Sequence, residues 1–122
     1  MIVAGFGFRS GANVLALCSA YQLARENAPP ITHLATLADK ADGLAELANL
    51  LSLPVIAIAP EHLVGVHTMT ASAASQVARG LGSVAEACAL AALREHQPRL
   101  LTRRQISRDR MATCAIAQGA LP

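Results

Sequence analysis

The chain has 122 residues, of which 53% are hydrophobic and 15% are charged. This length suits one domain with a buried core, and this composition excludes a disordered chain. With no Trp, one Tyr and two Phe, the sequence is poor in the aromatic side chains on which nucleic acid-binding proteins stack bases. The net charge is only +2, but five of the ten basic residues lie close together within residues 99–110. They are Arg99, Arg103, Arg104, Arg108 and Arg110.

The cysteines and histidines show no metal-binding pattern. The three cysteines lie far apart with no CxxC, and the four histidines lack ligand spacing, so we expect reduced thiols and no metal site. The uncharged stretch 10–24 is too short to cross a membrane, and Arg9 interrupts the apolar residues before it. We therefore expect a soluble, cytoplasmic protein with no cofactor.

The first half of the chain alternates between strand and helix patterns. The apolar residues 2–6 predict a buried strand, and Ser10 is suited to cap a helix that runs to about residue 26. Residues 31–37 predict a second strand, followed by the charged turn DKADG. A second helix with an apolar stripe and a third strand over 54–59 complete the half; the stripe consists of Leu44, Leu47, Ala48 and Leu51.

This alternation predicts a parallel sheet covered by helices. Ligands of such sheets bind at the loops after the carboxyl ends of the strands. The loops that qualify are 6–11, 37–43 and 60–70.

The second half begins with one predicted helical turn over 61–66 and a helix over 72–79 that ends at Gly80. Ser83 and Glu86 then form a capping-box pattern before a helix expected over 84–95. Two strands follow, which no helix separates, so we expect an antiparallel hairpin. These strands cover 99–102 and 111–117 and are joined by the arginine-rich segment RRQISRDR.

Together these elements predict a single α/β domain over residues 1–122. We expect three layers, with a mainly parallel sheet of about five strands, helices on both faces and a C-terminal antiparallel hairpin.

The segment GFGFRSGA, residues 5–12, is the most distinctive motif. It departs from the dinucleotide fingerprint G-x-G-x-x-G, because Ser10 stands where the third glycine is required and Gly11 comes one place later. No acidic residue lies about 20 residues further on, and GK[ST] is absent. Two interpretations stay open. The turn either binds an anion through backbone N–H groups and Arg9, or it only joins a strand to a helix.

Three other groups are candidates for binding or chemistry. Asp39 and Lys40 are suited to acid–base work or to holding a polar ligand, although a charged turn is the simpler interpretation. Gly80 and Gly82, just before Ser83, leave room for a second ligand-facing turn. The arginine hairpin either is solvated or reaches acidic groups of a ligand, and the low overall charge disfavours nucleic acid.

Four segments in the same order and spacing resemble the CobE family of cobalamin biosynthesis, whose module also forms the C-terminal domain of CbiG proteins. They are GFGFRSGA, LATLADKAD–GL, GLGSVAEACAL and MATCAIAQ, and they span nearly the whole chain. Two departures stand out. Phe8 occupies the position of the family's usual cysteine, and Asp39 and Lys40 are adjacent where a slightly wider spacing is expected.

The resemblance implies a role in making the corrin ring. CbiG proteins are associated with lactone opening and acetaldehyde release, so either assistance to such a step or transfer of the intermediate to other pathway enzymes is implied. A precorrin carries acetate and propionate groups, and the residues expected to bind them are Gly7, Arg9, Ser10, Gly11, Lys40, Gly82, Ser83, Arg103 and Arg104.

Asp39 and Lys40 are the only candidates for catalysis, and Ser83 and Glu86 are expected to cap a helix. A phosphate- or nucleotide-binding domain and a non-catalytic interaction module remain the alternatives. We expect no nucleic acid and no membrane as partner, and the sequence leaves homodimerisation open.

Overall fold

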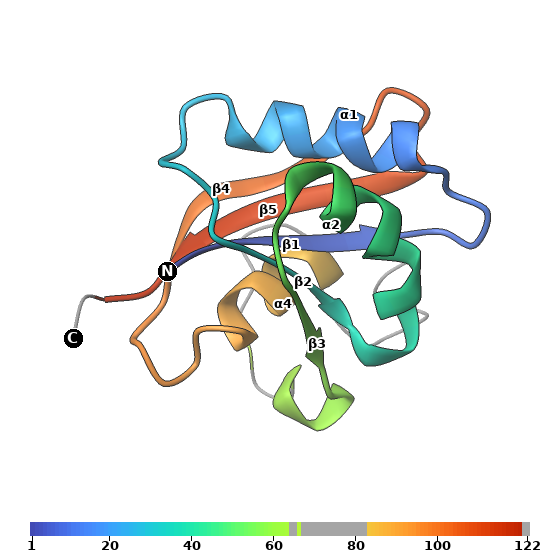
Figure 1. The fold of residues 1–122 in the computed structure, drawn as a ribbon. Coiled ribbons are helices and arrows are strands. Elements are labelled where there is room, and N and C mark those ends of the chain that lie inside the picture. Colours follow the sequence, from blue (N-terminus) through green and yellow to red (C-terminus); the bar gives the residue numbers. More distant parts are fainter. Residues whose placement is uncertain (64–65, 67–82, 121–122) are drawn as a thin grey trace.

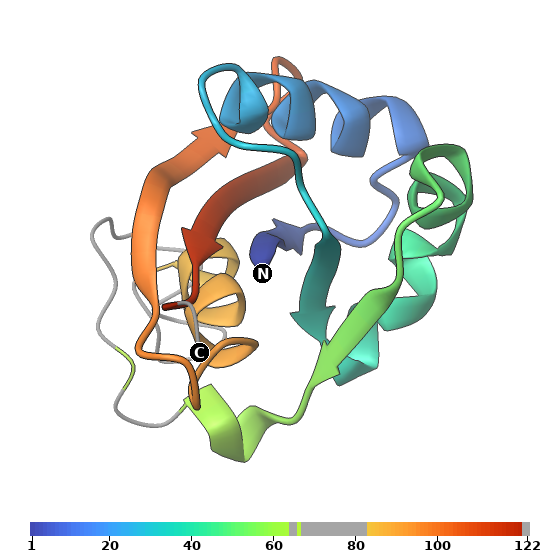
Figure 2. The same ribbon diagram turned by 60° about the vertical axis from the view of Figure 1, so that its left-hand side comes forward.

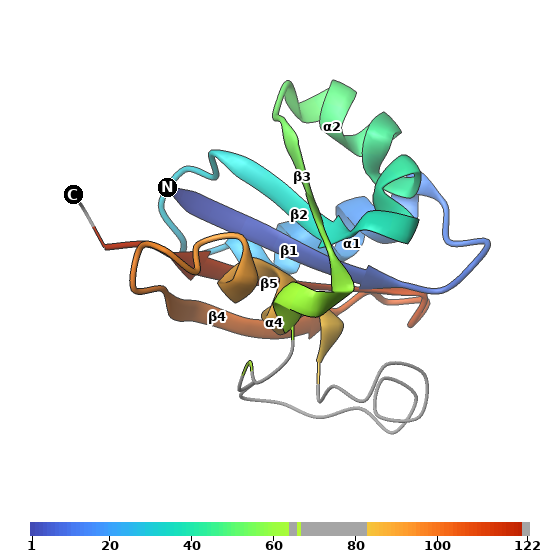
Figure 3. The same cartoon turned by 90° about the horizontal axis from the view of Figure 1, so that it is seen from below.

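Five strands form one sheet in the order β3-β2-β1-β5-β4 in the computed structural model, which describes residues 1–63, 66 and 83–120 (Figure 3). β1, β2 and β3 are parallel, whereas β5 runs antiparallel to both β1 and β4. The strands are β1 (Ile2–Phe8), β2 (His33–Leu37), β3 (Val55–Ile58), β4 (Arg99–Ile106) and β5 (Ala112–Gln118).

The expectation of a mainly parallel sheet was therefore wrong, because the sheet is mixed. The predicted C-terminal hairpin is present, and the short turn between β4 and β5 makes these two strands antiparallel. Since β5, rather than β4, takes the place beside β1, it also pairs antiparallel with the central strand.

Helices cover both faces of the sheet, as expected. Figure 1 and Figure 2 show α1 and α2 on one side of the strands and α4 on the other. No helix among the described residues is long and apolar enough to pass through a membrane. The helical elements are α1 (Val14–Arg25), η1 (Ala38–Leu44), α2 (Ala45–Leu51), η2 (Pro60–Leu63) and α4 (Val84–Ala91).

Alternation along β1 divides the core into two clusters. Ile2, Ala4 and Phe6 pack with α1 and α2, whereas Val3 packs in the cluster that includes α4. This is the period-two pattern of a strand that is buried on both faces. β1 is thus the central strand against which both helix layers are built.

The first glycine of GFGFRSGA allows α4 to approach β1 closely. A Cβ at Gly5 would overlap the carbonyl oxygen of Ala85 and lie 2.6 Å from the backbone nitrogen of Ala89. A Cβ at Gly7 would lie 3.2 Å from that of Val84. These glycines therefore belong to helix–sheet packing and not to a turn.

The turn after β1 starts later than the sequence suggested. β1 continues to Phe8, which pairs with Ala112, so residues 7 and 8 are strand and not loop. The predicted cap was wrong: α1 begins at Val14, and Asn13 is its N-cap, accepting a hydrogen bond from the Ala16 backbone N–H at 3.0 Å. The longer strand moves the helix start beyond Ser10.

Other helices and strands also have bounds that differ from those expected. The DKADG segment lies in the 3-10 helix η1, and η2 occupies the place of the helical turn expected over 61–66. β4 includes Arg103 and Arg104, which we expected in the loop. α4 ends at Ala91, earlier than expected. The helix expected over 72–79, with Gly80 and Gly82, lies outside the described residues.

Candidate functional site

Four segments meet at the end of the sheet where β1 finishes, on the right in Figure 1. The loop 9–13 leaves β1 there, and the turn 107–111 between β4 and β5 lies beside it, joined by a hydrogen bond from the Arg9 N–H to the Met111 carbonyl (2.9 Å). η1 follows the carboxyl end of β2. α4 begins near Gly7. The carboxyl edge of the parallel strands is thus the region that the sequence predicted for a ligand.

Phe8 links β1 to η1 at this edge. The Lys40 Nζ lies 5.4 Å from the centroid of the Phe8 ring, within the range of a cation–π interaction. Gly43 faces the same ring, because a Cβ there would lie 2.6 Å from Phe8 Cε2. The structure therefore brings Lys40 next to the residue that directly precedes Arg9.

The loop after β1 is open to solvent. Arg9, Ser10 and Gly11 are exposed, and Gly11 has a φ of 88°, a conformation that favours glycine. Within the described part of the chain, no acceptor bonds the backbone N–H groups of Ser10 and Gly11. The loop ends at the N-terminus of α1, where the helix dipole favours negative charge.

The start of α4 is built differently, because it is buried. Ser83 is 2% exposed and is the N-cap of α4, its hydroxyl accepting a hydrogen bond from the Glu86 N–H at 3.2 Å. The Glu86 side chain is fully buried, and its Oε2 accepts a hydrogen bond from the Arg104 N–H at 2.9 Å. Glu86 therefore joins α4 to β4, which the capping pattern did not reveal.

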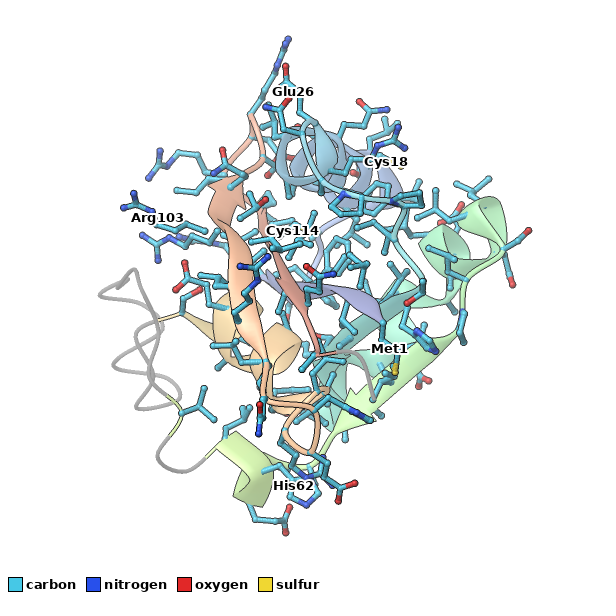
Figure 4. The ribbon with its side chains drawn as sticks, turned by 90° about the vertical axis from the view of Figure 1, so that its left-hand side faces the viewer. Met1, Cys18, Glu26, His62, Arg103 and Cys114 are labelled. Carbon is cyan, nitrogen blue, oxygen red and sulfur yellow. The ribbon has the colours of Figure 1, made fainter. Side chains whose placement is uncertain are left out.

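A β-bulge explains how Arg104 reaches Glu86. The register between β4 and β5 shifts between Thr102 and Gln105, so the backbone around Arg103 and Arg104 departs from the regular ladder. Bulges redirect backbone and side-chain groups in this way. Figure 4 shows Arg103 reaching outward from β4, and its side chain is exposed.

The turn between β4 and β5 is held by polar side chains. The Ser107 hydroxyl donates to Asp109 Oδ1 at 2.6 Å and accepts from the Ala112 N–H at 3.0 Å. The Met111 N–H donates to Asp109 Oδ1 at 3.0 Å. The two hydrogen bonds that Asp109 accepts lower the pKa of its carboxyl, and the bond from Ser107 has the larger effect. The turn thus presents exposed Arg108 and Arg110 from a fixed backbone.

The described residues contain no group of three or more His, Cys, Asp or Glu side chains arranged to hold a metal ion. The cysteines at positions 18, 88 and 114 form no disulfide. Burial raises the pKa of the Cys114 thiol, which disfavours the reactive thiolate, and Figure 4 shows this residue inside the protein. The chemistry of the carboxyl edge therefore depends on cations, backbone N–H groups and the exposed carboxylates Asp39, Asp42 and Asp109.

Seven of the predicted site residues lie in two places. Arg9, Ser10 and Gly11 lie on the exposed loop that follows Phe8, and Lys40 lies on η1 over the Phe8 ring. The second group consists of Ser83, Glu86 and Arg104, which meet where α4 packs on β4.

Sequence analysis missed Asn13, Phe8 and Gly43. The cap at Asn13 was recognisable as one of the preferred N-cap residue types, once the strand was known to extend to residue 8. Phe8 was noted only as a substitution for a cysteine. Its contacts with Lys40 and Gly43 depend on the packing of η1 against β1, which has no local signal in the sequence.

The fold is a three-layer α/β domain whose carboxyl edge carries exposed arginines. The chain belongs to the family described as Cobalamin synthesis G C-terminus, whose model matches residues 2–117. It is a protein of the cobalamin biosynthesis pathway.

Solved structures agree with this family. CobE, a protein from the cobalamin (vitamin B12) biosynthetic pathway, is 30% identical with a TM-score of 0.84, over 96% of this chain and 89% of that chain. The cobalamin biosynthesis protein chiG from Agrobacterium tumefaciens str. C58 is 33% identical with a TM-score of 0.74, over 99% and 100%.

A putative cobalamin biosynthesis protein G homolog from Sulfolobus solfataricus, 17% identical with a TM-score of 0.64, shares the fold over 95% of this chain and 36% of its own. Comparison with curated protein sequences gives no significant match.

Proposed function

We propose that this domain binds a precorrin intermediate at the carboxyl edge of its parallel strands and assists its processing or its transfer to another pathway enzyme. The observation that carries the proposal is the position of Lys40 over the ring of Phe8, the residue directly before exposed Arg9. Among the described residues, neither cation forms an ion pair with a carboxylate. A ligand fringed with carboxylates would supply the missing anions.

The loop after β1 adds directional donors to these charges. The Ser10 and Gly11 N–H groups and the N-terminus of α1 favour an anion, and Arg9 offers a planar guanidinium that suits a carboxylate. Arg108 and Arg110 extend the positive surface along the neighbouring turn. Arg103 is exposed on the outer side of β4, where it would meet only a broad ligand or a partner protein.

The geometry favours binding over independent catalysis. Glu86 is fully buried, and its carboxylate accepts a hydrogen bond from the Arg104 N–H where α4 packs on β4. Asp39, adjacent to Lys40 in η1, is the remaining candidate for acid–base work. We therefore assign Arg9, Ser10, Gly11 and Lys40 to ligand binding, and Asp39 to any proton transfer.

A titration of the purified protein with precorrin pigments tests this function. We expect a change in the visible spectrum and retention of pigment on gel filtration. Arg9→Ala should weaken binding by about 1–3 kcal/mol, because it removes a charge-assisted hydrogen bond.

Arg25→Ala is the matched control, since Arg25 lies at the end of α1 away from the Arg9 loop and should leave the affinity unchanged. Binding of ATP or NAD with no retained pigment would instead support the nucleotide alternative. Equal affinity of Arg9→Ala and the wild type would remove Arg9 from the site.

A further inference from the structure

We propose that Phe8 is a positioning residue, which holds the Lys40 ammonium beside the Arg9 loop so that the two cations act as one carboxylate-binding pair. This inference rests on the proposed function and adds to it the means by which the spacing of the cations is set.

The position of Phe8 fits this role. It ends β1, and its backbone is fixed by pairing with Ala112. Phe6, two residues earlier, is fully buried in the core with Tyr21, whereas the Phe8 ring is only partly buried. The ring therefore lies between the ordered sheet and the ligand-accessible edge.

The absence of a side chain at Gly43 leaves space for the Phe8 ring. Because a Cβ at Gly43 would lie 2.6 Å from Phe8 Cε2 and 2.8 Å from Cζ, any side chain there would displace the ring. Gly43 and Lys40 both belong to η1, so a single ring contacts the backbone and the cation of the same element. η1 is thereby tied to β1 at this point.

Without this contact, Lys40 would be a long, flexible side chain, and holding it in place would cost conformational entropy on binding. The negative face of an aromatic ring attracts an ammonium at 5.4 Å without neutralising its charge. Lys40 thus stays available to a carboxylate. Arg9 directly follows Phe8, so the residue that contacts Lys40 is also the last strand residue before the Arg9 loop.

The position of the Lys40 ammonium over the Phe8 ring can be tested without any ligand, because Lys40 is the only lysine in the chain. Reductive ¹³C-methylation labels only Lys40 and the N-terminal amine, and the Lys40→Met variant identifies the lysine signal. We expect its methyl protons to be shifted upfield by the ring current of Phe8. The shift should vanish in Phe8→Leu and decrease in Gly43→Ala, whose Cβ displaces the ring.

Binding is tested with uroporphyrin III, a macrocycle with eight carboxylates, in unlabelled protein. Phe8→Leu should weaken binding about two- to fivefold, the size of an exposed cation–π contact. Lys40→Met should weaken it at least as much, because it removes the ammonium that binds the carboxylate. The double variant should be no weaker than Lys40→Met alone, because Phe8 acts through Lys40. Arg25→Met is the matched control, since Arg25 lies 5.8 Å from the Tyr21 ring centroid at the other end of α1.

The outcomes distinguish a failure of the positioning role of Phe8 from a failure of the proposed precorrin binding. An upfield methyl signal with no binding of uroporphyrin or precorrin would sink the proposed function and leave the positioning of Lys40 by Phe8 in place. Binding with no ring-current shift, or additive losses in the double variant, would overturn the positioning role. If Phe8→Leu fails to fold, Gly43→Ala provides both measurements.

Discussion

The N-termini of α1 and α4 lie near the end of the same strand, but they are built in opposite ways. α1 starts after an exposed loop, and Asn13 caps it at the surface. α4 starts from buried Ser83 and packs so closely on β1 that Gly5 cannot carry a side chain. The first start leaves backbone donors accessible, whereas the second uses its polar groups for packing.

This difference teaches that a glycine-rich strand end need not be a ligand loop throughout. In GFGFRSGA, the first two glycines serve the α4 side and only Gly11 serves the turn, with its φ of 88°. The two halves of the motif should therefore respond differently to substitution: the strand half through stability and the loop half through binding.

The largest effect is expected from Gly5→Ala. The new Cβ would overlap the Ala85 carbonyl oxygen, and both contacting groups are backbone or helix atoms that cannot rotate away, so we expect a loss of about 3 kcal/mol or more of unfolding free energy. Urea denaturation would measure it. Gly7→Ala is the control, because its contacts of 3.1 and 3.2 Å involve side-chain atoms and should cost less. Equal stability of Gly5→Ala and the wild type would contradict the close packing.

Glu86→Ala should come next. It leaves the Arg104 N–H without its Glu86 acceptor and removes a buried side chain, and it should lower the unfolding free energy by about 2 kcal/mol. Glu86→Gln retains an acceptor oxygen and should cost less. If both variants lose the same amount, the hydrogen bond to Arg104 is not what stabilises this junction.

The two caps provide a smaller and more direct comparison. Ser83→Ala and Asn13→Ala should each cost about 1 kcal/mol, because each removes a side-chain acceptor from a helix N–H. Ser10→Ala should leave thermal stability nearly unchanged, since Ser10 does not cap α1. A larger loss for Ser10→Ala than for Asn13→Ala would reverse the assignment of the cap.

The smallest effect concerns pH and is confined to the turn between β4 and β5. The pKa of Asp109 is lower in the folded protein than in the unfolded chain, so its stabilising contribution is present above about pH 4 and is lost as the pH falls through the folded pKa. Amide exchange at Met111, corrected for its intrinsic pH dependence, should quicken in that acid range. In Asp109→Asn this additional acceleration should be absent.

Several parts of the fold were predictable because their signals are local. Strand and helix patterns in residues 1–60 identified the three parallel strands, and Ser83 identified the start of α4. The same alternation predicted that the carboxyl ends of these parallel strands lie at one edge of the sheet. The helix start at Asn13 was missed because β1 extends to Phe8 through pairing with β5, a partner more than 100 residues away in the sequence.

The family could also be predicted from the sequence, since four short motifs kept their order and spacing. The antiparallel pairing of β5 with β1 could not, because an antiparallel hairpin signal leaves open which of its strands lies beside the parallel ones. The placement of Arg103 and Arg104 in β4 likewise depends on a bulge opposite β5.

The sequence by itself thus determined the layered α/β class, the capped start of α4 and the family, because caps, periodicity and motif order are local properties of the chain. Only the tertiary structure decided which glycines pack and which turn, that Glu86 bonds the backbone of β4, and that Phe8 and Lys40 meet. These are contacts between segments far apart in the chain, and they depend on how closely each helix approaches the sheet.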